Sequence, residues 1–244
     1  MLIVNADDWG GWPTATDAAL ACYEKGRITS VSAMVFMNDS KRAADLSKQC
    51  GFNVGLHLNF TQEFTGDLSK YPFLHQYHRR IARFLRSSKY TLLVYHPFLR
   101  RQFRYLFEAQ FEEFIRLYGK PPSHFDGHQH MHLCTNMLLD GILPEGAKVR
   151  RSFSFSPSEK GAVNRAYRRW VDRRLEARHR LSDCFYCLGD CLRRNHLEVV
   201  FQLALTANVE LMTHPERKRE CSFLLSNRFH VLLARISNTT YAPP

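Results

Sequence analysis

The stretch "LIVNADDWGG", residues 2–11, opens with apolar side chains and then changes to two adjacent carboxylates, Asp7 and Asp8. A short apolar run of this kind is typical of a buried strand, and we predict a strand over residues 2–6. In parallel β/α folds the functional groups gather where the strands end. Side chains of successive strand residues point to opposite sides, so both carboxylates can reach one site only if the strand has ended there and the chain turns at the following glycines.

Strand-like and helix-like segments alternate along the rest of the chain, as expected for parallel β/α units. We predict helices over residues 14–25, 40–50, 102–118, 135–142, 195–206 and 228–236, and strands over 29–36, 53–60, 123–126, 147–151 and 208–213. This order predicts an α/β fold, a TIM-like and irregular (β/α) barrel with the active site at the C-terminal ends of its strands. We assign residues 1–244 to a single domain, with a basic irregular segment or insertion around 156–192.

Composition limits the class of protein. The chain has 244 residues, of which 45% are hydrophobic, but it contains no run of about 18 apolar residues that would span a membrane. No secretion signal is recognised, and we expect a cytoplasmic protein, soluble or peripherally associated with a membrane. The seven cysteines are an odd number and do not suggest a disulfide framework. Cys184, Cys187 and Cys191 begin a zinc-like pattern without a second C-x2-C, so a helical or core placement stays open beside the zinc site.

The formal charge of +11 comes largely from arginine-rich stretches at 78–86, 99–104 and 164–180, where aromatic residues lie between the arginines. Such stretches could contact an anionic membrane surface. The alternative is a set of solvated helix faces whose arginine stems cover apolar neighbours. Because no nucleic-acid-binding motif accompanies the charge, we do not expect a nucleic-acid partner. A homo-oligomer stays open.

Carboxylates and imidazoles follow several of the predicted strands. Besides Asp7 and Asp8, they are His57, the cluster "HFDGHQHMH" at 124–132, and His214. Oxygen and nitrogen donors that meet at one end of a barrel are typical of a divalent-metal hydrolase. Each has a structural alternative, since adjacent aspartates also occur in turns and a histidine in an apolar strand is commonly a hydrogen-bonded core residue. Their joint placement at successive strand ends favours the functional interpretation.

Four ordered motifs, "NADDWG", "GLHLNF", "HFDGHQHMH" and "VELMTHP", resemble those of the YdjC-like carbohydrate deacetylases, a family that includes chitooligosaccharide and hopanoid-biosynthesis-associated deacetylases. The resemblance spans most of the chain, although residues 156–192 contribute little to it. It implies a (β/α) barrel, one divalent metal ion, and hydrolysis of an N-acetyl group from an amino sugar in an oligosaccharide or glycolipid. It further implies that Asp8, His57 and His128 bind the metal and that Asp7 is the catalytic base.

The remaining site residues are assigned from the chemistry of amide hydrolysis. His214 is expected to stabilise the oxyanion or to protonate the leaving amine. Two imidazoles and one carboxylate suit magnesium or zinc best, with manganese and iron as alternatives. We expect the other polar and aromatic residues of the motifs to orient the ligands or to contact substrate, and these residues are Asp126, His130, His132, Trp9 and Asn59.

The chain departs from the usual family pattern at Trp9, at residues 11–13, at Gly127 and at Glu216, and these changes bear on the shape of the substrate pocket. Two other functions stay open. A metal-dependent phosphoesterase would use similar ligands and would employ the arginines. A non-catalytic basic protein that binds glycans or nucleic acid is the third alternative, although the intact ligand set argues against a decayed site.

Overall fold

Six parallel strands form the centre of the computed structural model, which describes residues 1–51, 53–155 and 159–237. The strands stand side by side in the order β4-β3-β2-β1-β6-β5. They are β1 (Leu2–Trp9), β2 (Ser30–Ala33), β3 (Asn53–Leu58), β4 (Phe125–Gly127), β5 (Cys184–Cys187) and β6 (Val209–Thr213). The α/β class, the parallel strands and the irregular barrel are confirmed. Residues 52, 156–158 and 238–244, with the start of the expected insertion, lie outside the described part.

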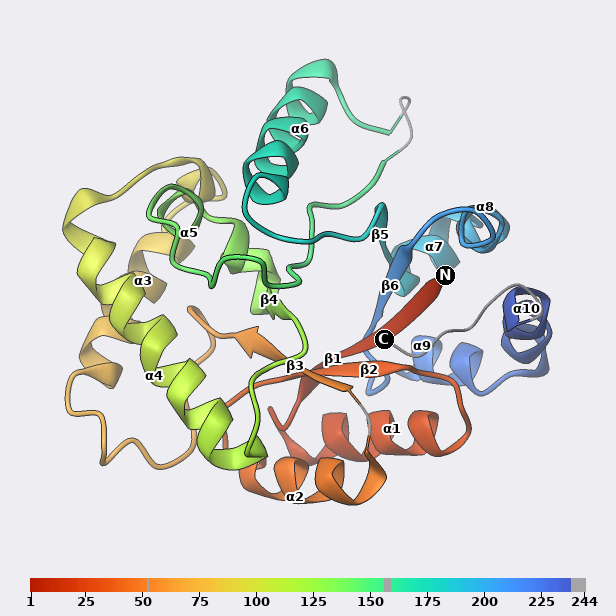
Figure 1. The fold of residues 1–244 in the computed structure, drawn as a ribbon, viewed down its shortest axis with the longest axis horizontal. Helices are drawn as coiled ribbons and strands as arrows, with labels where there is room; N and C mark the ends of the chain where they lie inside the picture. Colours follow the sequence, from red (N-terminus) through yellow and green to blue (C-terminus); the bar gives the residue numbers. More distant parts are fainter. Residues whose placement is uncertain (52, 156–158, 238–244) are drawn as a thin grey trace.

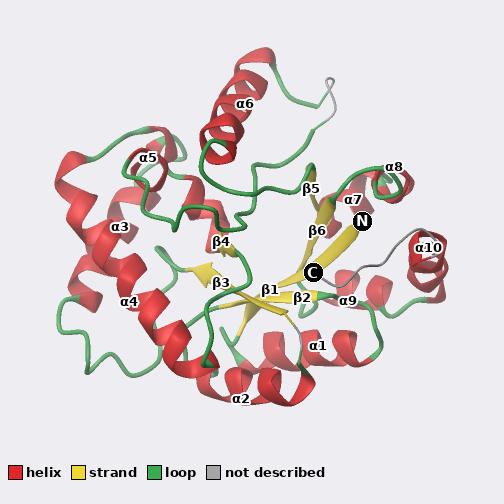
Figure 2. Ribbon diagram, viewed as in Figure 1, coloured by secondary structure: helices red, strands yellow, loops and turns green. Residues whose placement is uncertain are grey.

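Helices surround the strands (Figures 1 and 2). Those of the first half are α1 (Pro13–Glu24), α2 (Ser40–Cys50), α3 (Leu74–Arg86), α4 (Arg100–Tyr118) and α5 (Thr135–Leu139). Those of the second half are α6 (Ala162–Glu176), α7 (Leu188–Arg194), α8 (Leu197–Leu203), α9 (Lys218–Leu224) and α10 (Asn227–Ser237). Short 3-10 turns are η1 (Thr91–Leu93), η2 (Pro97–Leu99) and η3 (His128–Leu133). Apolar side chains between the strands and these helices form one buried core.

The segment 147–154 spans the gap between the two edge strands. The Arg150 amide donates to the Phe125 carbonyl of β4 at 2.9 Å, and the Val149 amide donates to the carbonyl of Arg180 at 2.9 Å. Farther along, the Ser154 amide donates to the Phe185 carbonyl of β5 at 2.9 Å. The predicted strand over 147–151 is therefore wrong as a regular strand, because its pairing is limited to isolated parallel bridges. It still closes the interior of the barrel from this side.

Other predictions need correction. Helix α3 was not predicted, because its stretch was interpreted as a basic cluster, yet Leu74, Ile81 and Leu85 bury one of its faces. Helix α9 was also missed. The part of 156–192 that the structure describes holds a regular helix, α6, and a regular strand, β5. The interpretation of this stretch as an irregular segment or an insertion stays a prediction.

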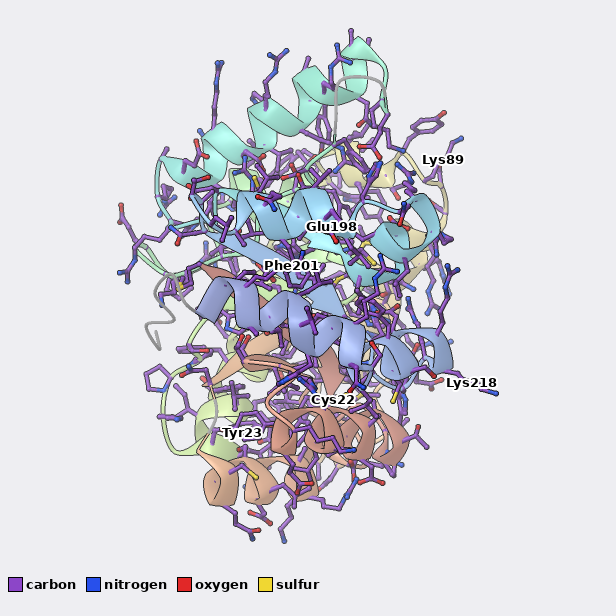
Figure 3. All side chains as sticks on the ribbon, turned by 90° about the vertical axis from the view of Figure 1, so that its right-hand side faces the viewer. Cys22, Tyr23, Lys89, Glu198, Phe201 and Lys218 are labelled. Carbon is purple, nitrogen blue, oxygen red and sulfur yellow. The ribbon has the colours of Figure 1, made fainter. Side chains whose placement is uncertain are left out.

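The cysteines are free thiols in this structure. Cys184 and Cys187 bound β5, and Cys191 is buried on α7. Among the described residues, the groups able to hold a metal ion do not include these cysteines, which favours the core placement over the zinc site. The nearby helices α8 and α10 pack through apolar side chains. Phe201 of α8 packs edge-on against Phe229 of α10 with ring centroids 5.9 Å apart, and Figure 3 shows Phe201 between the two helices.

None of the described helices is both long and apolar enough to cross a lipid bilayer.

Candidate metal and catalytic site

A bulge in β1 directs two consecutive carboxylates into one site. Ala6 pairs with Val31 of β2 and Trp9 pairs with Ala33, so Asp7 and Asp8 together stand opposite a single residue. Asp8 has a φ of 63°, in the left-handed region that is uncommon for residues other than glycine. The expectation that the strand ends before these residues is therefore wrong. The strand continues to Trp9, and the bulge supplies the change of direction.

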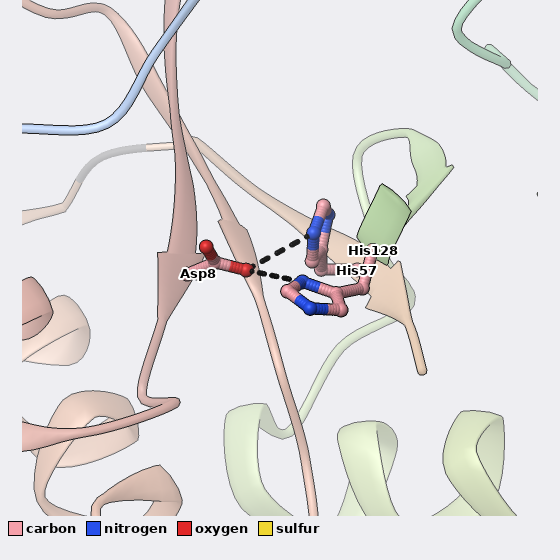
Figure 4. A group of neighbouring side chains, drawn as sticks. All are labelled: Asp8, His57 and His128. Atoms are coloured by element: carbon pink, nitrogen blue, oxygen red, sulfur yellow. Dashed lines mark hydrogen bonds and ion pairs between the residues drawn. The ribbon is translucent and has the colours of Figure 1, made fainter. Parts of the chain in front are cut away.

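Asp8, His57 and His128 meet at the C-terminal ends of β1, β3 and β4 (Figure 4). Asp8 Oδ1 lies 2.9 Å from His128 Nδ1 and 3.3 Å from His57 Nε2. Asp8 and His57 are buried, whereas His128 is half-buried and lies at the start of η3. The three expected ligands, separated by up to 120 residues, thus converge on one point.

The donor set fits a divalent ion. One carboxylate and two imidazole nitrogens offer ligand atoms that all lie within 4.8 Å of one another, a combination that zinc, iron and manganese sites use. Burial would raise the pKa of Asp8, but hydrogen bonds from His128 and His57 hold it well below its usual range. Burial would likewise lower the pKa of His57, but the charges of Asp126 and Asp7 raise it to about 10. A bound cation would replace the proton that His57 otherwise carries.

Asp126 fixes the orientation of His57. Its Oδ1 lies 2.8 Å from His57 Nδ1, and its Oδ2 accepts a hydrogen bond from Ser32 Oγ at 2.7 Å. An imidazole that donates one N–H to a carboxylate presents its other nitrogen as a ligand, here Nε2 facing Asp8. Asp7, His57 and Asp126 also stand close enough to hold an ion, but both carboxylates are occupied by the same guanidinium.

That guanidinium belongs to Arg150, which sequence reasoning missed. Its side chain is completely buried and bonds three carboxylates, those of Asp7, Asp126 and Glu210, at 2.6–2.7 Å. Burial would lower the pKa of Arg150, but the charges of Asp126 and Asp7 raise it well above its usual range. The pattern of residues 147–151 does not distinguish Arg150, because Lys148, two residues earlier in the segment, is exposed whereas Val149 and Arg150 are both buried.

Asp7 lies beside the group formed by Asp8, His57 and His128, and both of its carboxylate oxygens accept hydrogen bonds. Its Oδ1 accepts hydrogen bonds from Asn5 Nδ2 at 2.9 Å and from Arg150 Nη2 at 2.7 Å, and its Oδ2 accepts one from Arg150 Nη1 at 2.7 Å. A carboxylate offers about four acceptor positions, two on each oxygen. The remaining position is on Oδ2.

His214 follows β6 and faces the same group. Its Nε2 lies 3.9 Å from Asp8 Oδ2, and its buried Nδ1 has no hydrogen-bond partner among the described residues. Burial lowers the pKa of His214, which favours the neutral imidazole. The backbone amide of His214 donates to Glu220 Oε2 at 2.8 Å, which anchors the loop that carries it.

The other expected site residues lie farther from the ligand atoms. His132 Nε2 bonds the Arg150 carbonyl at 3.0 Å and thereby supports the segment that carries the guanidinium. His130 packs against Phe153 with ring centroids 4.5 Å apart. Trp9 is completely buried, and Asn59 Oδ1 accepts from two backbone amides of its own turn. The structure therefore gives Trp9 and Asn59 packing and turn roles, with no access to an open pocket for Trp9.

Glu216 places a partly buried carboxyl group near the site, with Oε1 at 3.9 Å from Arg217 Nε. Its Oε2 is buried without a hydrogen-bond partner among the described residues. Burial raises the pKa of Glu216 from 4.5 to about 7, and the charge of Asp8 adds to this. Because the folded state binds this proton more tightly than the unfolded state, the group makes folding less favourable as the pH rises from 4.5 to about 7.

Glu216→Gln is therefore expected to stabilise the metal-free protein at about pH 8, by about 1 kcal/mol, since partial contact with water reduces the full effect of the shift. At pH values about one unit or more below 4.5, where the wild-type carboxyl is largely protonated in both states, the difference should vanish. Denaturant unfolding at both pH values measures it. An equal effect at the two pH values would show that the variant acts through packing instead of charge.

The chain is similar to known proteins over most of its length. A family model described as "YdjC-like protein" matches residues 1–235. A chitooligosaccharide deacetylase of Serratia marcescens is 33% identical over 138 residues, which cover 54% of this chain and 51% of that protein. A carbohydrate deacetylase of Mus musculus is 29% identical over 250 residues, covering 88% of this chain and 77% of that protein. The matched part thus spans only about half the length of the bacterial relative.

A crystal structure from Enterococcus faecalis has the same fold. It is described as a candidate cellobiose-phosphate cleavage protein, and it superposes with a TM-score of 0.65 over 96% of this chain and 94% of the other. The two chains are 17% identical, so this likeness concerns the fold alone.

Proposed function

Because this chain belongs to the YdjC-like protein family, we propose that it is a metal-dependent hydrolase that removes an N-acetyl group from an amino sugar. The observation that carries the proposal is the convergence of Asp8, His57 and His128 directly beside Asp7. The two relatives named as deacetylases support the substrate class. The amino sugar is part of an oligosaccharide or a glycolipid.

Asp7 is the proposed base. A divalent ion at Asp8, His57 and His128 would supply Lewis acidity, which polarises the acetyl carbonyl and makes a water molecule more acidic. Asp7 Oδ2, which keeps one acceptor position, takes the proton from the attacking water. Arg150 and Asn5 hold this carboxylate in a fixed position, so little rearrangement is needed during proton transfer.

His214 is the proposed proton or hydrogen-bond donor. A neutral imidazole beside Asp8 can donate one N–H to the oxygen on which negative charge develops, or pass a proton to the leaving amine. Removal of a donor of this kind costs a factor on the order of 10²–10³ in turnover in comparable sites.

An activity screen tests the reaction class. Purified protein is given N-acetylated chitooligosaccharides, a nitrophenyl phosphate and a nucleic acid, each with and without chelator. We expect acetate release from the oligosaccharides that stops on chelation and returns when magnesium or zinc is restored. Manganese and iron are also tested for restoring it. Phosphate release would identify a phosphoesterase instead. Binding of a glycan or nucleic acid without any turnover would identify the non-catalytic alternative.

The arginine-rich stretches lead to a second proposal, that the protein docks on anionic membranes. Large apolar side chains are exposed near them, among them Phe98, which is 83% exposed, and Val163 of α6, which is 85% exposed. We expect co-sedimentation with anionic liposomes that weakens as salt rises, and little with neutral liposomes. Equal recovery with both, or no effect of salt, would leave the arginines as solvated helix faces. The cytoplasmic location and the oligomeric state are separate predictions.

A further inference from the structure

A cavity lies at the opposite end of the barrel from the candidate site. We call it the lower cavity. It has a volume of about 230 Å³, and residues at the start of every strand contribute to it. Leu2, Ser30 and Asn53 are the first residues of β1, β2 and β3, while Ser182 and Asn208 come just before β5 and β6. An engineered cavity of about 150 Å³ binds benzene, so this one has room for a molecule the size of a monosaccharide.

Two cationic side chains stand at the lower cavity. Lys148 and Arg180 both line it, both are exposed, and a parallel bridge joins their backbones. Neither forms an ion pair with a carboxylate anywhere in the described ranges. One acidic residue of the described chain lines the cavity, Glu210, and its Oε1 is already bonded to Arg150 at 2.6 Å. The charge at the opening is therefore positive and not compensated by the protein.

The walls offer hydrogen-bonding groups that the protein leaves free. Ser182 Oγ is buried and has no partner within the described part of the chain. Asn53, which is half-buried, and Asn208, which is exposed, also line the cavity, and their side-chain amides form no hydrogen bond to another described residue. A buried hydroxyl without a partner is uncommon, because it loses its hydrogen bonds to water without replacing them. Hydroxyl groups on a ligand would satisfy all three.

We propose that the lower cavity binds a small hydroxylated anion, a sugar phosphate or a sugar acid, with its anionic group between Lys148 and Arg180 and its hydroxyls at Asn53, Ser182 and Asn208. Arginine and lysine are the usual partners of phosphates and carboxylates. Asn5 and Arg150 also line the cavity and bond Asp7, so a bound molecule lies next to side chains that hold the proposed base. The proposal does not depend on the reaction class.

Isothermal titration tests it with four probes, glucose 6-phosphate, gluconate, glucose and inorganic phosphate, in the presence of chelator. We expect saturable binding of glucose 6-phosphate or of gluconate, and weaker binding of glucose and of inorganic phosphate. Which of the two anions binds shows whether the ligand is a sugar phosphate or a sugar acid. The double variant Lys148→Gln/Arg180→Gln should weaken binding of the preferred anion by about tenfold or more, since it removes both cations that would bond the anionic group. The matched control is Lys70→Gln/Arg80→Gln, which removes two exposed cations that do not line the cavity.

Asn208→Phe, which fills the cavity, should abolish binding of all four probes while leaving the unfolding transition cooperative. The proposal is overturned if no hydroxylated anion binds saturably, if glucose or inorganic phosphate binds as tightly as the preferred anion, or if either cavity variant retains wild-type affinity.

Discussion

Replacement of Arg150 by methionine is expected to destabilise the fold by about 3–5 kcal/mol, the usual cost of removing one partner from a buried ion network. The guanidinium is fully buried and bonds Asp7, Asp126 and Glu210, so its loss leaves three buried carboxyl groups without their shared cation. Burial already raises the pKa of Glu210 to about 7 with Arg150 in place. Denaturant unfolding of wild type and variant measures the difference.

A matched control is Arg80→Met, which removes a guanidinium from the exposed face of α3. It should change stability by no more than about 0.5 kcal/mol. Arg150→Lys keeps a charge but lacks the planar set of donors that bonds all three carboxylates. Its loss of stability should therefore lie between those of Arg150→Met and Arg80→Met. If Arg150→Met is as stable as Arg80→Met, the network does not support the fold in the way described.

The second large effect separates the two carboxylates of the β1 bulge. Asp7→Asn should retain the metal ion but lower turnover by a factor on the order of 10²–10⁴, because an amide oxygen cannot take the proton from water. Asp8→Asn should lose metal affinity, because the amide removes the negative charge that both imidazoles face. Acetate release and metal content, measured on the same preparations, distinguish the two.

Folding must be controlled in this experiment, since Asp7 also bonds Arg150. Circular dichroism at the assay temperature shows whether each variant is folded, and the acidic limb of the pH–rate profile should change in Asp7→Asn alone. Loss of metal from Asp7→Asn with retention in Asp8→Asn would reverse the two roles. Unchanged acetate release in both would remove this site from the reaction.

The alternation of elements was sufficient to predict that the carboxylates and imidazoles at the strand ends meet at one end of the barrel, because parallel strands bring their C-terminal ends to one edge. The choice of Asp8, His57 and His128 among them came from the resemblance to the YdjC-like family, and the structure brings these three residues together. The bulge could not be predicted, since nothing in "NADDWG" indicates that Asp8 adopts a φ of 63° while the strand continues to Trp9. Which residue takes the left-handed conformation depends on the pairing with β2, a long-range property.

Arg150 and Glu210 escaped prediction for a related reason. An arginine in a basic chain is ordinarily exposed, and only the closure of the barrel by residues 147–154 places this one among three carboxylates. The same closure defines the lower cavity, whose lining comes from the starts of strands far apart in sequence. The fold class followed from the alternation of elements, whereas the polar interior depended on how the barrel is completed.

The central claim is that Asp8, His57 and His128 hold one divalent ion on which acetate release depends. Its most direct test measures metal content by mass spectrometry and acetate release from N-acetylated chitooligosaccharides in wild type, His128→Ala and the exposed control His75→Ala. We predict about one ion per chain and full activity in wild type and His75→Ala, with both lost together in His128→Ala. Full metal occupancy and turnover in His128→Ala would contradict the claim.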